Sequence, residues 1–400
     1  MTRKIADENP PSEIIQTGIV DNWEGGVIGE SKSHHVHRQR VAWIDLIRVT
    51  SAFLVVVAHA TAPYDDSMPG TVPDPFWWFG NIVNTLTRCA VPMFLMVSGY
   101  LLLSKKKSLW HGYFNRFVKI GIPLLVWSII YFYVRWWEPV GQVVDNKYQG
   151  GFYDALRNIL LGNGEHLWFL YAILSLYLVA PIFHSYLKSA SRDNKTYFLL
   201  LCGFVCFVWP IISVLLKKLF DVDNINFDFF LMHSSIGYFV VGYFLGHQKI
   251  RMRTCLLCLG AFVMITLVIT EIGFAFSNSN LGGFSQPTNR RLTLIHYYNM
   301  RIPLALLLFV VIKYIGETQF YRQSRLSATI SRFSGFAFGI YIVHVLVMHT
   351  IGDGVLGFAF NSRTFDPWFS IPLVSIVVFF LSAAMVWLLR KIPLVRWILP

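Results

Sequence analysis

The sequence predicts an all-α integral membrane protein, with about ten transmembrane helices in one bundle and both termini in the cytoplasm. Of its 400 residues, 55% are hydrophobic and only 14% are charged, and the mean hydropathy is +0.51. Soluble domains are closer to one quarter charged, so a water-soluble chain of this composition would lack the polar residues to cover its surface. A spanning helix needs about 20 mostly apolar residues, and ten segments of the chain meet that requirement.

The ten apolar segments follow one another along the chain and are separated by polar loops. They are 42–63, 77–103, 117–137, 166–187, 196–216, 227–246, 254–276, 292–315, 329–351 and 368–389. Residues 41–400 are therefore expected to form one polytopic membrane domain. Residues 1–40 are polar and lack the early apolar core of a signal peptide, so we predict a disordered cytoplasmic tail.

The orientation follows from the basic residues, which give the chain a net charge of +12. They are scattered over short loops, which favours the positive-inside rule over nucleic-acid binding. With the N-terminus in the cytoplasm, nineteen Lys and Arg residues fall inside and seven outside. Cys255 and Cys258 have metal-site spacing but no second pair, so we interpret the cysteines as packing residues and expect no metal.

The first segment contains three ionisable residues, which are costly in a membrane and usually face a polar cavity or a partner. They are Asp45, Arg48 and His59. Arg48 and His59 are eleven residues apart, which leaves them only ~20° from the same helix face, with a rise of ~16 Å between them. Asp45 lies on that face as well. The alternative is an Asp45–Arg48 pair at the membrane interface and a His59 that only fills space in the core.

Cations also occur in the second and third segments. Arg88 is near mid-membrane, at a depth similar to that predicted for His59, unless it is a structural guanidinium satisfied by backbone carbonyls. Arg116 and Lys119 begin the third segment at the cytoplasmic side. They are either snorkelling side chains that reach lipid headgroups or a clamp for phosphate groups.

The later segments add more polar groups. The fourth segment begins with His166 and Trp168 at the outer surface, where Trp168 is either an interfacial anchor or a wall of a site. Further ionisable residues in or beside segments are His233, Glu271, Arg301, His344 and His349. So many together indicate a hydrated interior.

At this point the chain resembles the membrane acyltransferase-3 family, whose members O-acylate bacterial glycans and other acceptors. The signature of an arginine, ten residues and a histidine matches Arg48 and His59, after Asp45. Four further motifs match in order, at Arg88, Pro92, Phe94, Ser98, Gly99 and Tyr100; at Arg116, Lys119 and Pro123; at His166, Trp168 and Phe169; and at Gly339, Ile340, Tyr341 and His344. The resemblance covers residues 41–390.

The resemblance implies an acyl-CoA-dependent membrane O-acyltransferase of the bacterial inner membrane. Acyl-CoA, with acetyl-CoA the expected donor, would bind from the cytoplasm with its phosphates at Arg48, Arg116 and Lys119. The acceptor would be a glycan or a lipid-linked glycan. Membrane lipids are expected partners, nucleic acid is not, and a homo-oligomer or a polysaccharide assembly complex is left open.

The resemblance also implies roles for the remaining residues. His59 would be the general base for the acceptor hydroxyl or a transient acyl carrier, with Asp45 orienting Arg48 and Arg88 stabilising the oxyanion. The residues expected on the acceptor side are His166, Trp168, Tyr341 and His344.

Two other classes of protein compete with this interpretation. A membrane transporter or a polysaccharide exporter would also need charges inside the membrane, but the inverted repeats and paired broken helices typical of transporters are not evident in the sequence. For a scaffold without catalytic activity, buried arginine and histidine would be a needless cost.

Overall fold

The computed structural model describes residues 41–65, 73–104, 110–136, 165–209, 234–278, 302–354, 356–393 and 395–399, together with positions 153, 156, 159, 212 and 216. Every regular element in these residues is helical, which confirms the all-α prediction. The predicted tail 1–40 and two of the ionisable residues singled out above, His233 and Arg301, lie outside the described residues.

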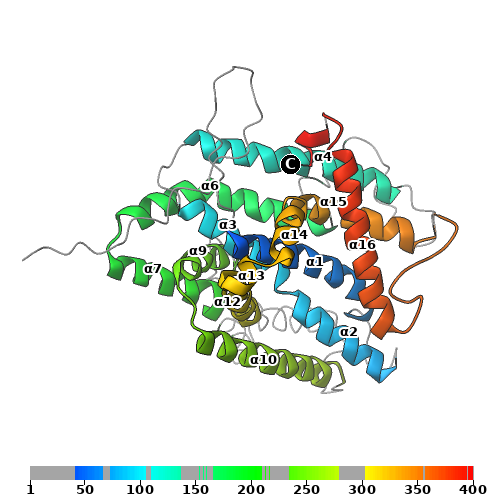
Figure 1. The fold of residues 1–400 in the computed structure, drawn as a ribbon, viewed down its shortest axis with the longest axis horizontal. Helices are drawn as coiled ribbons and strands as arrows, with labels where there is room; N and C mark the ends of the chain where they lie inside the picture. The colour runs from blue at the N-terminus through cyan, green and yellow to red at the C-terminus, as the bar shows by residue number, and fades with distance from the viewer. Residues whose placement is uncertain are drawn as a thin grey trace, which may run out of the picture. The chain divides into compact units, whose positions relative to one another are not determined.

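The helices are shown in Figure 1 in their order along the chain. They are α1 Ala42–Asp65, α2 Asp74–Thr87, α3 Ala90–Leu103, α4 Trp110–Trp136, η1 Glu165–Leu167, α6 Trp168–Ser189, α7 Arg192–Gly203, η2 Phe204–Val208, α9 Ser234–His247, α10 Met252–Asn278, α12 Ile302–Glu317, α13 Gln319–Arg322, α14 Arg325–Ser334, α15 Ala337–Gly352, α16 Pro367–Leu389 and η3 Val395–Trp397.

Six candidate membrane spans occur in the described residues, judged by length and composition. They are Ala42–Tyr64, Pro75–Leu103, Gly112–Val134, Trp168–Ser189, Met252–Ile272 and Pro367–Leu389. Each overlaps one of the predicted segments, so the chain is a multi-pass membrane protein. Three other predicted segments, 196–216, 227–246 and 292–315, run partly into residues that the structure does not describe. The total of ten spans therefore stays a prediction.

The prediction of one continuous helix over 329–351 is wrong. The chain forms α14 and α15 there, and the two helices are bent by 69° relative to each other. Ser331 and Ser334 of α14 donate hydrogen bonds to the Asp45 carboxylate of α1, at 2.9 and 2.7 Å. These bonds hold α14 against α1, whereas the apolar residues of α15 continue in a different direction.

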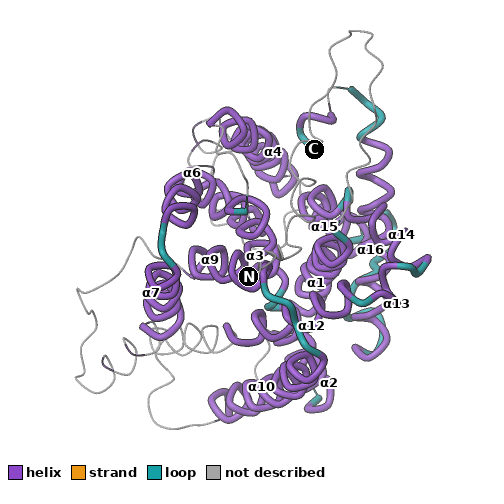
Figure 2. Tube along the Cα trace, turned by 60° about the vertical axis from the view of Figure 1, so that its left-hand side comes forward, coloured by secondary structure: helices purple, strands orange, loops and turns teal. Residues whose placement is uncertain are grey.

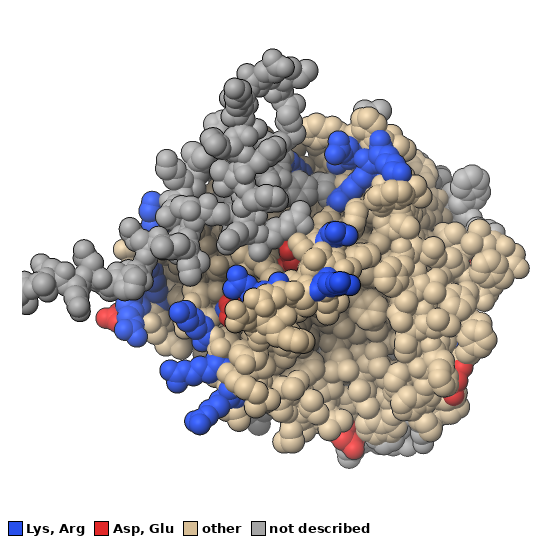
Figure 3. Space-filling view, in the orientation of Figure 1, with Lys and Arg blue, Asp and Glu red and all other residues tan. Residues whose placement is uncertain are grey.

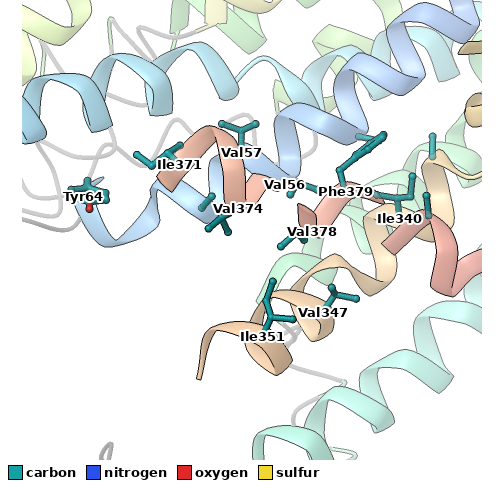
Figure 4. Close-up of a cluster of buried hydrophobic side chains, with 14 residues drawn as sticks. Val56, Val57, Tyr64, Ile340, Val347, Ile351, Ile371, Val374, Val378 and Phe379 are labelled. Carbon is teal, nitrogen blue, oxygen red and sulfur yellow. The ribbon is translucent and has the colours of Figure 1, made fainter. Parts of the chain in front are cut away.

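Helix α1 is at the centre of the packing. It contacts α2, α3, α12, α14, α15 and α16, and in Figure 2 it lies among α3, α12, α15 and α16. Figure 4 shows one of the contacts, where Val56 and Val57 of α1 pack against apolar side chains of α15 and α16. Because α15 is held in this way along α1, its polar residues are brought beside those of the first span.

Two glycines allow the backbones of α3 and α9 to approach closely. A Cβ at Gly99 would lie 1.8 Å from the backbone oxygen of Phe239, and a Cβ at Gly242 would lie 2.2 Å from that of Met96. Only glycine fits at either position, and such small-residue contacts are typical of helix pairs in membranes. Gly99 belongs to the Ser98-Gly99-Tyr100 motif, so packing is one physical reason for that motif.

The surface of the described residues carries wide apolar areas, as a lipid-facing surface requires. Figure 3 shows Lys and Arg gathered towards the centre and left of the view, including the region of α13 and α14, with few charges on the right. Helix α10 exposes Leu256, Leu257 and Met264, each more than half accessible.

Candidate active site

Three histidines from separate parts of the chain meet in the interior. His59 comes from α1, His166 from η1 and His344 from α15. The ring centroids are 5.0 Å apart for His59 and His344, 6.0 Å for His59 and His166, and 4.8 Å for His166 and His344. The sequence predicted all three as site residues, and the structure brings them together.

His166 is fixed by contacts with α4 and α15. Its Nε2 atom is 3.0 Å from the backbone oxygen of Ile342, which also accepts a hydrogen bond of 2.6 Å from the Tyr131 hydroxyl. The Tyr341 hydroxyl donates in turn to the backbone oxygen of His166. The start of the fourth span is therefore tied to α15 next to His344.

His344 is held by its own helix. Its Nδ1 atom is 2.7 Å from the backbone oxygen of Tyr341 and 3.2 Å from that of Ile340. His344 is fully buried, and His166 is 3% exposed. Their other ring nitrogens, His344 Nε2 and His166 Nδ1, are buried and have no hydrogen-bond partner among the described residues.

His59 differs from its two neighbours because its side chain is partly exposed. Arg88 lies near enough for its positive charge to act on the His59 imidazole, and His349, five residues beyond His344 on α15, is a second titratable group within reach of it. Arg88 follows the last residue of α2, where the chain turns before α3 begins at Ala90. The arrangement places a partly exposed imidazole, a guanidinium and two buried histidines in one place.

Asn84 is a polar residue near this cluster that the sequence analysis missed. It is 1% exposed, and neither its side-chain nitrogen nor its side-chain oxygen has a hydrogen-bond partner in the described part of the chain. It lies one turn before Arg88 on α2. The signal was present, because Asn81, Asn84, Thr85 and Arg88 form a polar stripe at helical spacing within an apolar segment.

A second group of cations lies nearer the start of α1. The charges of Arg48 on α1 and Arg116 on α4 both act on the hydroxyl of Tyr177 on α6, so the three side chains are neighbours. All three are partly exposed, as is Lys119, one turn along α4 from Arg116. The structure therefore brings two of the predicted phosphate-binding residues together and adds Tyr177, an aromatic residue in an apolar run that gave no sequence signal.

The side chain of Trp168 points away from that of His166. Its side chain is 49% exposed, because it lies two residues beyond His166 and so points roughly 160–200° away around the helix. This exposure suits an interfacial anchor, and a role of Trp168 on the acceptor side stays a prediction. Tyr341 is buried against His166, with ring centroids 5.5 Å apart, and its role on the acceptor side also stays a prediction. Glu271 is exposed on α10.

Comparison with known proteins identifies the family. A family model described as an acyltransferase domain, that of the acyltransferase-3 group, matches residues 41–387. Comparisons with curated proteins and with solved structures gave no match. Because the model covers most of the chain, the protein belongs to the acyltransferase-3 family and is a membrane acyltransferase.

Proposed function

We propose that the protein transfers an acyl group, with acetyl the expected one, from cytoplasmic acyl-CoA to a hydroxyl group of a glycan or a lipid-linked glycan at the bacterial inner membrane. The observation that carries this proposal is the partly exposed His59 beside Arg88 and two buried histidines, on the same helix as Arg48. Family membership supports acyl transfer; the donor, the acyl group and the acceptor are parts of the proposal.

The cation group supports an acyl-CoA donor. Arg48 and Arg116 come from different helices yet act on the same tyrosine, and two guanidinium groups in one place suit the phosphates of CoA. His59 is eleven residues further along α1, which corresponds to a rise of ~16 Å. A donor that binds with its phosphates at Arg48 would extend along α1 to present its thioester near His59.

The histidine cluster supports transfer to a hydroxyl group. The acceptor oxygen attacks the thioester carbonyl, a C–O bond forms and the C–S bond breaks. His59 takes the hydroxyl proton as general base and passes it to the departing CoA sulfur. Arg88 stabilises the negative oxygen of the tetrahedral intermediate, since its charge already acts at this position.

Chemical analysis of the surface glycans tests this function. We expect a strain that lacks the gene to lose ester-linked acyl groups from one glycan, and the intact gene to restore them. Membranes that contain the protein should move radiolabel from [acetyl-¹⁴C]acetyl-CoA into base-labile ester. A strain that keeps every ester but fails to export its polysaccharide would instead support the transporter interpretation.

A further inference from the structure

The tautomers of His166 and His344 follow from their contacts with backbone carbonyls. A carbonyl oxygen only accepts hydrogen bonds, so the nitrogen that faces it carries the proton. His344 is therefore protonated on Nδ1, which faces Tyr341 and Ile340, and His166 on Nε2, which faces Ile342. In each neutral ring the opposite nitrogen then carries a lone pair.

These two lone pairs lack hydrogen-bond donors among the described residues. His344 Nε2 and His166 Nδ1 are buried and unpartnered, and leaving a buried acceptor unsatisfied is costly. Because both atoms are buried, a bulky acceptor substrate cannot reach them directly. The cluster's remaining imidazole, His59, is partly exposed and offers an N–H group.

The ring distances suit a hydrogen bond between His59 and His344. Two imidazoles joined by an in-line N–H···N bond have centroids about 5 Å apart, given a nitrogen–nitrogen distance of about 2.9 Å. The His59 and His344 centroids are 5.0 Å apart with the rings tilted by 57°, whereas those of His59 and His166 are 6.0 Å apart and nearly perpendicular. By this measure the rings of His59 and His344 are at hydrogen-bonding separation, and those of His59 and His166 are not.

We propose that His344 is the positioning residue of His59. Its Nε2 lone pair accepts the N–H of His59, so the other nitrogen of His59 carries the lone pair and faces the reacting hydroxyl. When His59 takes up the hydroxyl proton, both of its nitrogens are protonated and the bond to His344 persists. His344 keeps its own Nδ1 proton throughout, and the proton on His59 leaves to the CoA sulfur. This inference rests on the proposed role of His59 as general base.

The arrangement resembles the one in which a carboxylate orients a catalytic histidine, with a neutral imidazole in place of the carboxylate. A carboxylate would be expensive at this depth in a membrane domain. A histidine fixed by its own helix backbone supplies the same directed lone pair without a charge. Among the described residues, the charged or titratable groups near His59 include His166, His344, His349 and Arg88.

Two variants of similar volume separate hydrogen bonding from packing. His344→Gln places an amide group that accepts a hydrogen bond near the position of Nε2, whereas His344→Met has almost the same size and flexibility but is a poor acceptor. We expect His344→Gln to stay within about threefold of wild-type turnover and His344→Met to lose at least about tenfold. The KM for acetyl-CoA should not change in either variant, because the phosphates bind elsewhere.

The assay uses membranes that contain the full-length chain, labelled acetyl-CoA and the host's own polysaccharide, with activity expressed per folded molecule. His184→Met is the matched control. His184 is also buried, with Nδ1 at 3.2 Å from the Leu103 carbonyl and Nε2 unpartnered in the described residues, but it lies outside the histidine cluster. The activity of His184→Met per folded molecule should equal that of the wild type.

Equal activities for His344→Gln and His344→Met would overturn the proposal. A His344→Phe variant, which keeps a ring, would also overturn it if it were more active than His344→Gln.

A measurement on the unaltered protein covers the case in which the variants fail to fold. We expect ¹⁵N NMR of the full chain with labelled histidine to show a nitrogen–nitrogen coupling across the His59–His344 hydrogen bond. A wild-type spectrum without that coupling would overturn the proposal.

The His59→Gln variant separates failure of the proposed function from failure of this inference. Normal acyl transfer by His59→Gln would contradict the role of His59 as general base. An inactive His59→Gln together with a fully active His344→Met would contradict only the positioning role of His344.

Discussion

His59 is distinguished from its two neighbouring histidines by its partial exposure and by the charge of Arg88 nearby. A general base needs access to the substrate and a nitrogen that can take a proton. We expect His59→Ala to insert and fold but to lower acylation at least about 100-fold, the usual scale for removing a positioned acid–base group. His59→Gln should fail as well, because an amide keeps much of the volume but does not take up a proton. The measurement is the amount of ester-linked acyl group on the glycan, at equal expression of each variant. Normal acylation by His59→Gln would show that His59 only packs in the core.

The two arginines near Tyr177, Arg48 and Arg116, lead to a second prediction. If Arg48 and Arg116 bind phosphate, Arg48→Ala and Arg116→Ala should each weaken CoA binding by about tenfold or more, as expected for a lost charge-assisted hydrogen bond. Wild-type binding should weaken as salt concentration rises. Arg332→Ala on the exposed face of α14 is the control and should bind CoA normally. Titration calorimetry of the purified protein would decide, and unchanged affinity in both variants would assign these arginines to lipid headgroups.

The contact between α3 and α9 depends on Gly99. A methyl group there would lie 1.8 Å from the Phe239 backbone oxygen, and that backbone cannot move without shifting α9. We expect Gly99→Ala to lower the free energy of unfolding by about 1–3 kcal/mol, as overpacking does. Gly260→Ala on α10 is the matched control, since nothing lies within 4 Å of a Cβ at that position. Thermal unfolding in detergent compares them, and equal Tm values would contradict the close contact.

The sequence predicted both ends of α1, α6, α10 and α16 to within two residues, because membrane spans are long apolar runs. It did not predict the break after Thr87 that divides the segment 77–103 into α2 and α3. It failed at α14 and α15, where the bend depends on hydrogen bonds from Ser331 and Ser334 to Asp45 on a distant helix. The candidate site was predictable to the same extent: the features within one helix were predicted, and the contacts between helices were not. Helical spacing placed Arg48 and His59 on one face, whereas the meeting of His59, His166 and His344 depends on how three elements pack. Tyr131 and Tyr177 were missed because a tyrosine in an apolar run looks like any other core residue.

Several helices of the membrane domain have one end near the beginning of α1, where side-chain contacts join them. Trp43 contacts Tyr100 near the end of α3, and Tyr100 contacts His247 at the end of α9, with ring centroids 5.0 and 5.1 Å apart. The amine of Lys313, near the end of α12, donates to the backbone oxygen of Gln248 at 2.6 Å. The exposed basic residues Lys249, Arg251 and Arg253 therefore lie at this end.

The last helix returns to the same end. Arg390, which follows α16, donates a hydrogen bond of 2.8 Å to the backbone oxygen of Gly335, and the neighbouring Ser334 bonds to Asp45 in the first turn of α1. At the other end, Tyr64 of α1 donates to the backbone oxygen of Ser362, shortly before α16 begins. The beginning of α1 and the end of α16 therefore lie together, as the predicted even number of spans would require.

In the predicted topology nineteen of the loop and terminal Lys and Arg residues are inside and seven outside, so by the positive-inside rule we expect that side to face the cytoplasm. We expect reporter fusions at Lys106, at Lys249 and at the C-terminus to show cytoplasmic signals only. A fusion at Arg363, beside Ser362 on the opposite side, is the control and should give a periplasmic signal. Arg390 is joined to Asp45, at the start of α1, through neighbouring residues of one short segment, and Lys249 lies at the same end of the domain. The C-terminus and Lys249 should therefore be found on the same side of the membrane. A periplasmic C-terminus with a cytoplasmic Lys249 would contradict both the even number of spans and the packing of α16 against Gly335.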